Sequence, residues 1–156
     1  MSFNININNN SSDLIQSSDL IQSSDLIQSL HVLNVIDISS AFCNIYYTGM
    51  MLAGLTNLLY LFDKNAQCNY NGKSFIGIHN VLSAFYTDYI AKLTYENLTY
   101  TPCIIDSTTI LIVVNGKCQK ISFWRQFSVL CNFSETFVLK YNNGNIYVIN
   151  YIFNLI

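Results

Sequence analysis

The C-terminal stretch FSETFVLKYNNGNIYVINYIF, residues 133–153, constrains the fold more than any other part of the chain. Two runs rich in aromatic and β-branched residues flank the segment NNGN at 142–145. An Asn-Gly pair supplies the positive φ angles of a hairpin turn, so the stretch predicts two antiparallel strands. Side chains of a strand alternate between its two faces. One face of the first strand is predicted to hold Phe133, Glu135, Phe137 and Leu139, and the other Ser134, Thr136, Val138 and Lys140.

The second run is apolar on nearly both of its faces. Strict alternation puts Ile146, Val148, Asn150 and Ile152 on one side, against Tyr147, Ile149, Tyr151 and Phe153. A strand that is apolar on both sides must be covered twice, by its own core and by something else. We expect the second cover to be another copy of the same sheet. The predicted homodimer interface is formed by Ile146, Val148 and Ile152.

The rest of the chain places helical patterns before strand patterns. Ser39-Ser40 is predicted to cap a helix, and apolar residues from Phe42 onward recur at helical spacing, with breaks expected at Gly49 and Gly54. The further predicted elements are a helix over 78–93, strands over 99–105 and 109–114, a turn at Asn115-Gly116, and a strand or long hairpin over 121–131. Helices followed by antiparallel strands predict an α+β fold.

An exact hexapeptide triplicate, SSDLIQ, occupies residues 11–28 after an Asn-rich start. Six residues turn a helix by roughly 600°, so successive Leu-Ile pairs move around the axis and build no single stripe. We therefore expect residues 1–29 to be a low-complexity tail, disordered or weakly helical, and residues 30–156 to be the folded domain. A docking peptide for a partner is the alternative interpretation of the repeat.

Composition excludes several classes of protein. The net charge is −2 and Arg125 is the only arginine, so no basic cluster is available for nucleic acid. The five cysteines contain no C-x-x-C pair, and neither histidine has metal-ligand spacing, so we expect no metal and no cofactor. Residues 38–62 carry no charge but hold several Ser, Thr and Asn residues, which favours a buried helix over a membrane span.

Several motifs, taken in order, resemble nuclear transport factor 2 family domains. The closing strands read F-x-x-T-F-V-L at 133–139 and Y-V-x-N-x-x-F at 147–153. Earlier, F-x-x-x-Y-Y stands at 42–47 and G-x-x-F-x-G at 72–77. The resemblance covers residues 39–155 and implies a curved antiparallel sheet wrapped by helices into a cone.

The resemblance also implies a function, that of a non-catalytic homodimer that binds FG-type peptides in nucleocytoplasmic transport. The localisation that it implies is the cytoplasm, the nucleus and the nuclear envelope. The peptide-binding positions that it implies are Phe42, Tyr60, Phe137, Asn150 and Phe153. Ran-GDP is a doubtful partner, because the family's acidic residue before the G-x-x-F turn is Asn71 here and only Asp106 remains of the later acidic loop.

Some distant relatives with this fold, the ketosteroid isomerases and scytalone dehydratases, place an acid-base pair inside the cone. A cone-pocket enzyme of that kind, or a small-ligand binder, is the alternative function. The groups available for it are Asp88, Asp106, Glu135 and His79. The sequence does not show which of them pair, so we predict no catalytic residue.

Overall fold

The computed structural model describes residues 20–87, 90–122, 129–142 and 145–156. The elements are α1 (Leu20–Ala53), the 3-10 helix η1 (Leu55–Leu61), β1 (Phe62–Tyr70), β2 (Lys73–Ile76), α2 (Ile78–Thr87), β3 (Ile90–Asp106), β4 (Thr109–Ser122), β5 (Val129–Asn142) and β6 (Asn145–Leu155). The strands form one sheet in the order β2-β1-β6-β5-β4-β3. Only the β1–β6 pair is parallel. The α+β class and the antiparallel pairing of the two C-terminal strands are confirmed, while residues 143–144 of the predicted turn lie outside the described ranges.

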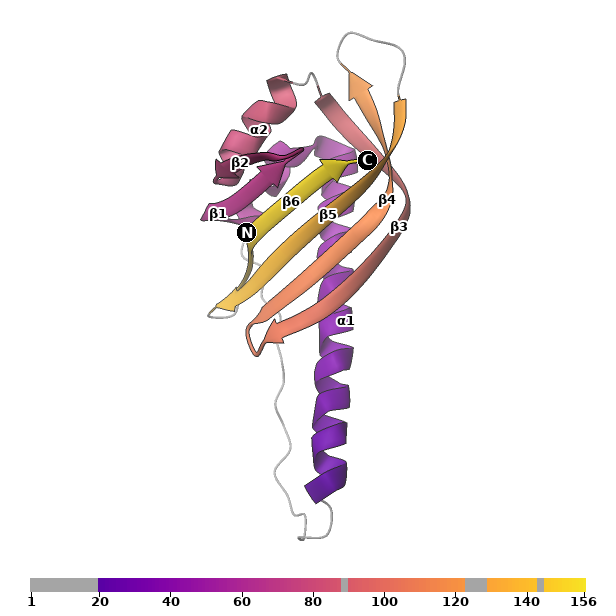
Figure 1. Ribbon diagram of the computed structural model, residues 1–156, viewed down its shortest axis with the longest axis vertical. Coiled ribbons are helices and arrows are strands. Elements are labelled where there is room, and N and C mark those ends of the chain that lie inside the picture. Colours follow the sequence, from indigo (N-terminus) through magenta and orange to yellow (C-terminus); the bar gives the residue numbers. More distant parts are fainter. Residues whose placement is uncertain (1–19, 88–89, 123–128, 143–144) are drawn as a thin grey trace.

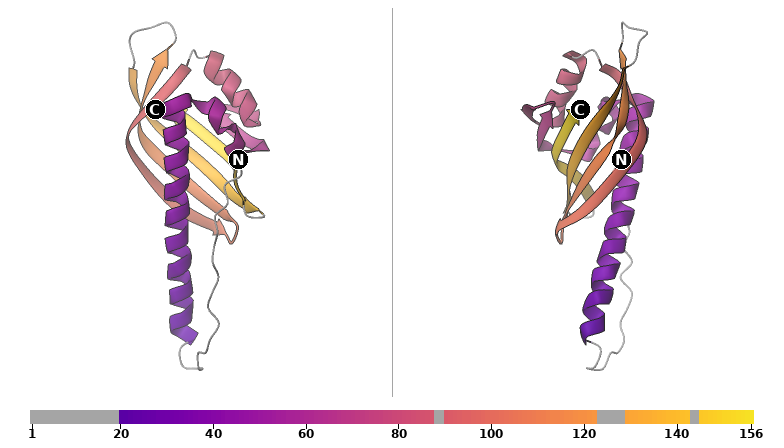
Figure 2. Two further views of the ribbon diagram at one scale, coloured as in Figure 1. Left: turned by 180° about the vertical axis from the view of Figure 1, so that it is seen from behind. Right: turned by 45° about the vertical axis from the view of Figure 1, so that its right-hand side comes forward.

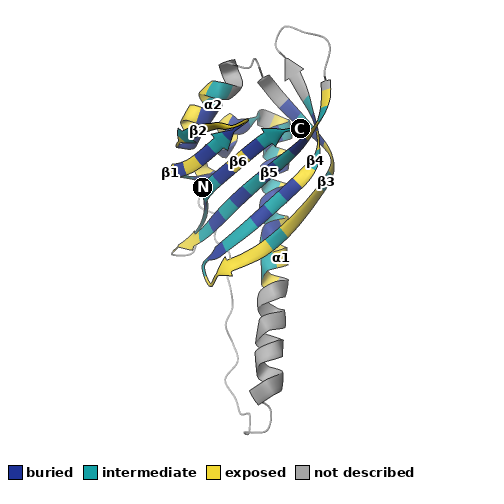
Figure 3. Ribbon diagram, viewed as in Figure 1, coloured by how far each residue is buried: buried dark blue, intermediate teal, exposed yellow. Residues whose placement is uncertain are grey.

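The helices leave one face of the sheet bare. Figure 1 is viewed from that bare side, with α1 behind the strands, and the reverse view in Figure 2 shows α1 crossing the other face. We call the side toward α1 the inner face and the bare side the outer face. Over residues 133–140 of β5 the inner residues are buried and the outer ones half-buried, the alternation visible in Figure 3. The predicted division of Phe133–Lys140 between two faces is therefore correct.

The predicted face of β6 is wrong, because the strand contains a β-bulge. Its register against β5 shifts in mid-strand, where Ile149 is an extra residue on the β6 side. Val148 before the bulge and Tyr151 after it both point inward, and both are 0% exposed. One inserted residue reverses the alternation beyond it. Ile152 therefore lies on the outer face, while Val148 lies in the core and Ile146 beside it.

Helix α1 begins much earlier than the Ser39-Ser40 cap that we expected. Ser39 lies in mid-helix and is fully buried. Residues 20–29, assigned above to the tail, are helical, and residues 1–19 lie outside the described part of the chain. Neither Gly nor Pro occurs between Met1 and Thr48 to stop the helix. Extending a helix that is already formed costs far less than starting one, so propagation explains the length of α1.

The two glycines at the end of α1 have different roles. Gly54 has φ 73° and separates α1 from η1, as predicted for a residue without a Cβ. Gly49 does not break the helix. A Cβ atom at Gly49 would lie 2.5 Å from Cδ2 of Leu58, so this glycine lets η1 pack closely on α1.

Two further sequence predictions fail between α2 and β4. Helix α2 ends at Thr87, and Leu93, which was assigned to it, is a buried residue of β3. The Asn115-Gly116 pair lies inside β4 rather than at a turn. It stands opposite an irregularity of β3 where Asn97 has φ 54°, so the unusual backbone occurs in the partner strand. Of the predicted excursion over 121–131, residues 123–128 lie outside the described ranges.

Hydropathy along the described helices agrees with the expectation for residues 38–62. No helix in this part of the chain is long and apolar enough to cross a membrane.

Candidate functional site

The five residues predicted to bind peptide lie in three separate places. Phe42, Phe137 and Phe153 are core residues with exposures of 7%, 0% and 0%. The rings of Phe42 and Phe137 meet edge to face at 5.0 Å and close the space between α1 and the sheet. Tyr60 is 55% exposed on η1, and Asn150 lies on the outer face. Three of the five are core residues, so the described part of the chain does not bring the five together on one exposed surface.

A buried carboxylate lies at the centre of the inner face. Glu135 of β5 is 0% exposed and accepts hydrogen bonds from three tyrosine hydroxyls. Tyr46 and Tyr151 donate to Oε1 at 2.8 Å each, and Tyr47 donates to Oε2 at 2.5 Å. Tyr46 and Tyr47 are adjacent residues of α1, and Tyr151 belongs to β6, so the cluster ties the helix to the hairpin. We call these four residues the Glu135 cluster.

Burial controls the protonation of the Glu135 cluster. It raises the pKa of Glu135 to about 7, although the three hydroxyls oppose the shift by stabilising the charged form. Burial, reinforced by Glu135, also raises the pKa of each tyrosine well above its ordinary value. The tyrosines therefore act as hydrogen-bond donors, and the carboxyl is the group that exchanges a proton near neutral pH.

The Glu135 cluster was only half visible in the sequence. Glu135 was named as an available carboxyl, but eleven tyrosines offered no basis for choosing its partners. The signal that could have found two of them is the adjacent pair Tyr46-Tyr47 on one helical turn facing the strand. The other named groups are elsewhere: Asp106 is exposed at the end of β3, His79 is exposed on α2, and Asp88 lies outside the described residues.

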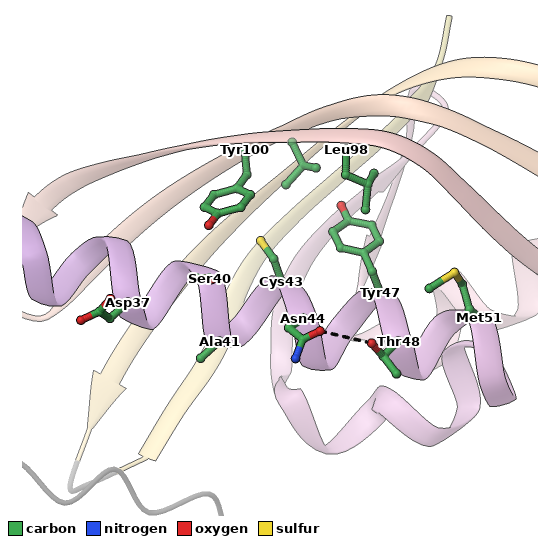
Figure 4. Close-up of a pocket in the computed structure, with 11 residues that line it drawn as sticks. Asp37, Ser40, Ala41, Cys43, Asn44, Tyr47, Thr48, Met51, Leu98 and Tyr100 are labelled. Atoms are coloured by element: carbon green, nitrogen blue, oxygen red, sulfur yellow. Dashed lines mark hydrogen bonds between the residues drawn. The ribbon is translucent and has the colours of Figure 1, made fainter.

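A groove of about 570 Å³ runs between α1 and the edge strand β3. Figure 4 shows Cys43 and Tyr47 pointing from α1 toward the strands, opposite Leu98 and Tyr100. Tyr47 is 4% exposed and its hydroxyl binds Glu135, so its side chain separates the groove from the carboxylate. Burial, then Glu135, raises the pKa of the Cys43 thiol to about 12, which makes it a poor nucleophile.

A second hollow, which we call the mouth pocket, opens where α1 passes the β3–β4 turn and the C-terminal hairpin. Its volume is about 410 Å³. The apolar wall consists of Val35, Ile38, Ile104, Ile110, Leu139, Tyr141 and Ile146. Asn34 of α1 and the polar residues at the β3–β4 turn complete the lining, and at this turn Asp106 accepts hydrogen bonds from Thr108 and Thr109. This combination of an apolar wall and a few placed polar groups is typical of a binding pocket.

The outer face carries two uncharged rows across the central strands. One row is Leu111, Val138 and Asn150, and the next is Val113, Thr136 and Ile152. All six side chains are half-buried or exposed, and none is covered by a helix (Figures 1 and 3). Lys117 and Lys140 lie toward opposite ends of this surface. At the β2 edge it deepens into a hollow of about 480 Å³ lined partly by Asn150 and Ile152.

Comparisons with known proteins agree on the fold. The profile of the nuclear transport factor 2 (NTF2) domain matches residues 38–155. No curated protein matches the chain significantly by sequence. Nuclear transport factor 2 from Cryptosporidium parvum is 19% identical with a TM-score of 0.60, covering 78% of this chain and 94% of that one.

Two other solved structures show how widely this fold is used. The Mtr2–Mex67 M domain complex of C. albicans is 12% identical with a TM-score of 0.62, covering 77% of this chain and 94% of that one. A putative scytalone dehydratase from Novosphingobium aromaticivorans is 8% identical with a TM-score of 0.64, covering 82% and 86%. Structures with the names of transport factors and of enzymes thus both match this chain, with TM-scores between 0.60 and 0.64.

Proposed function

The chain belongs to the nuclear transport factor 2 domain family, and from that premise we propose that it is a non-catalytic homodimer that binds phenylalanine-containing segments of other proteins. The observation that carries the proposal is that the outer face of the sheet is bare and that the two rows at its centre are uncharged. A sheet that is apolar on its second face needs a second cover. On this proposal the chain acts in transport between cytoplasm and nucleus.

A second copy of the chain fits the outer face. The two uncharged rows present Leu111, Val113, Val138 and Ile152 with only Thr and Asn among them. A two-fold axis would place each row against its counterpart, with lysines near the rim and not at the centre. The arrangement matches an interface that is depleted in charge at its core and polar at its rim.

We expect Ile152→Asp to convert the dimer to monomer or to aggregated protein. A carboxylate introduced at the centre of an apolar interface would be desolvated without a partner. The matched control is Ile36→Asp on α1, where the replaced side chain is 44% exposed against 36% for Ile152. Light scattering measures the outcome. A monomer at micromolar concentration for the unmutated chain would refute the proposed dimer.

The mouth pocket offers a separate position for a phenylalanine side chain. It lies between the first helix and the closing strands, near the region where the peptide groove was predicted. Its lining contains none of the five residues that were predicted to bind peptide. Apolar side chains line most of it, and Thr108 and Asp106 stand beside the opening. An aromatic ring would bury apolar area there, while the polar side could bind the backbone of the peptide.

Ile104→Asp is expected to weaken binding of an FG peptide by roughly thirtyfold or more, because it puts a charge on the pocket wall. Ile104 is 43% exposed, so the change spares the core, and Ile36→Asp again serves as the control. Calorimetry or chemical-shift titration of the dimer measures both affinities. Absence of any signal with FG peptides for the unmutated dimer would refute the peptide-binding proposal.

Ran-GDP is not part of the proposal. At the position where an acidic residue was expected, the Asn71 side chain accepts a hydrogen bond from the backbone N–H of Leu155 at 2.9 Å. Its own N–H donates to Phe153. This residue therefore secures the last strand and supplies no charge. Asp106 alone is a weak basis for a partner that needs several carboxylates.

Cone-pocket catalysis is the second candidate, and the Glu135 cluster is the observation that favours it. A carboxyl with a pKa of about 7 suits general acid-base chemistry. Glu135 is completely covered, however, and Tyr47 stands between it and the nearest groove. A substrate could reach the carboxyl only by displacing that tyrosine, and for this reason we place catalysis second.

A further inference from the structure

Two cysteines face each other across neighbouring strands, apart from the sites described above. Cys118 of β4 and Cys131 of β5 are directly opposite in the antiparallel register. Both lie on the inner face of the sheet, because Cys118 is four residues after the buried Val114 and Cys131 is two residues before the buried Phe133. Cys118 is 0% exposed and Cys131 is half-buried, and both are thiols in the structure.

We propose that Cys118 and Cys131 form a reversible intramolecular disulfide when the chain meets a low-molecular-weight disulfide such as oxidised glutathione. Directly opposite residues of an antiparallel pair have Cα atoms about 4.5–5.5 Å apart, within the range of disulfides. Their Cβ atoms are about 4.5–5.5 Å apart, against about 3.5–4.5 Å in a disulfide. Closing the bond therefore requires the strands to approach by roughly 1 Å.

The different exposures of the two thiols set the order of the reaction. The thiolate of Cys131, which solvent reaches, attacks one sulfur of oxidised glutathione and releases one glutathione thiolate. The Cys118 sulfur, on losing its proton, then attacks the Cys131 sulfur of the mixed disulfide and expels the second glutathione. Two protein thiols are oxidised and one glutathione disulfide is reduced to two thiols. An excess of reduced glutathione reverses both steps.

The other three cysteines have no comparable arrangement. Cys43 and Cys68 are buried, and burial raises the pKa of their thiols to about 12 and about 11, respectively. Cys103 is exposed on β3, and its register partner in β4 is Leu111. We therefore expect Cys103 to take up glutathione without closing an internal bond.

Peptide mapping of the full chain tests the proposal directly. The folded protein is treated with oxidised glutathione, its remaining thiols are blocked with N-ethylmaleimide, and it is digested with trypsin without reduction. Cleavage after Lys117, Lys120, Arg125 and Lys140 places the two cysteines in separate peptides, residues 118–120 and 126–140. We expect mass spectrometry to find these peptides joined as the main internal cross-link, and a reductant to separate them.

Two variants distinguish the proposed order from chance oxidation. Cys118→Ser should leave a stable glutathione adduct on Cys131, while Cys131→Ser should leave Cys118 unmodified. Cys103→Ser removes the exposed cysteine of β3, and the bond between Cys118 and Cys131 must still form in this variant. The proposal is overturned if the unmutated folded chain gives no link between the two peptides, or if Cys131 keeps its adduct as long as it does in Cys118→Ser.

Discussion

Phe137→Ala is expected to lower the free energy of unfolding by about 3–5 kcal/mol, the usual cost of emptying a large aromatic site in a packed core. Phe137 is 0% exposed and touches three rings, two from α1 and one from β6. Its ring centroid lies 4.7 Å from Tyr46, 5.0 Å from Phe42 and 5.5 Å from Tyr151. Removal of the ring therefore loosens α1 and the closing hairpin together. Urea denaturation followed by circular dichroism measures the loss.

The free energy of unfolding of further alanine variants distinguishes core residues from surface residues among those first predicted to bind peptide. Phe42→Ala should also destabilise the fold, because Phe42 is 7% exposed and packs on Phe137. Tyr60→Ala is the control, since a side chain that is 55% exposed leaves little packing to lose. Unchanged stability in Phe137→Ala would contradict the described packing between α1 and the sheet.

Stability is expected to fall as the pH rises from about 5 to about 8, because of Glu135. The pKa of its carboxyl is about 7 in the folded chain, above the value of 4.5 for an unburied glutamate. The protonated form is thus the one that folding favours. Its contribution is fully present below pH 4.5 and is lost as the pH rises through 7, with a total size of about 3 kcal/mol.

Glu135→Gln isolates this contribution from other titrating groups. An amide of the same shape does not titrate. Its oxygen can accept the two hydrogen bonds now made to Oε1, and its NH2 group in the place of Oε2 can donate to the Tyr47 hydroxyl. We expect the difference in free energy of unfolding between pH 5 and pH 8 to shrink markedly in the variant, as measured by urea denaturation at both pH values. An equal dependence on pH in both proteins would show that Glu135 is not the group responsible.

The hairpin was predictable from sequence because its signals are local. The positive φ angles that Asn-Gly favours and the alternation of Phe133, Glu135 and Phe137 depend on near neighbours alone. The same alternation failed in β6. A single bulge residue, Ile149, reverses the faces beyond it, and nothing in the apolar run indicates where the register shifts. The position of the bulge depends on how β5 and β6 pack against α1.

Local sequence patterns likewise failed to predict the length of α1 and the burial of the predicted binding residues. The SSDLIQ repeat has no apolar stripe, yet it contains no helix breaker, so α1 extends back to Leu20. Phe42 matches a motif position, but whether its ring lines a groove or fills the core depends on the distance between helix and sheet. In this chain Phe137 occupies that space.

The buried centre of the domain depends on tertiary structure almost entirely. The sequence by itself determined that Glu135 shares a face with Phe133 and Phe137, because alternation along one strand settles it. Only the tertiary structure decided that Tyr46, Tyr47 and Tyr151 converge on its two oxygens. Those contacts join residues 88, 89 and 16 positions apart in the chain. Contacts over such distances are set by the packing of helix on sheet, which no local pattern records.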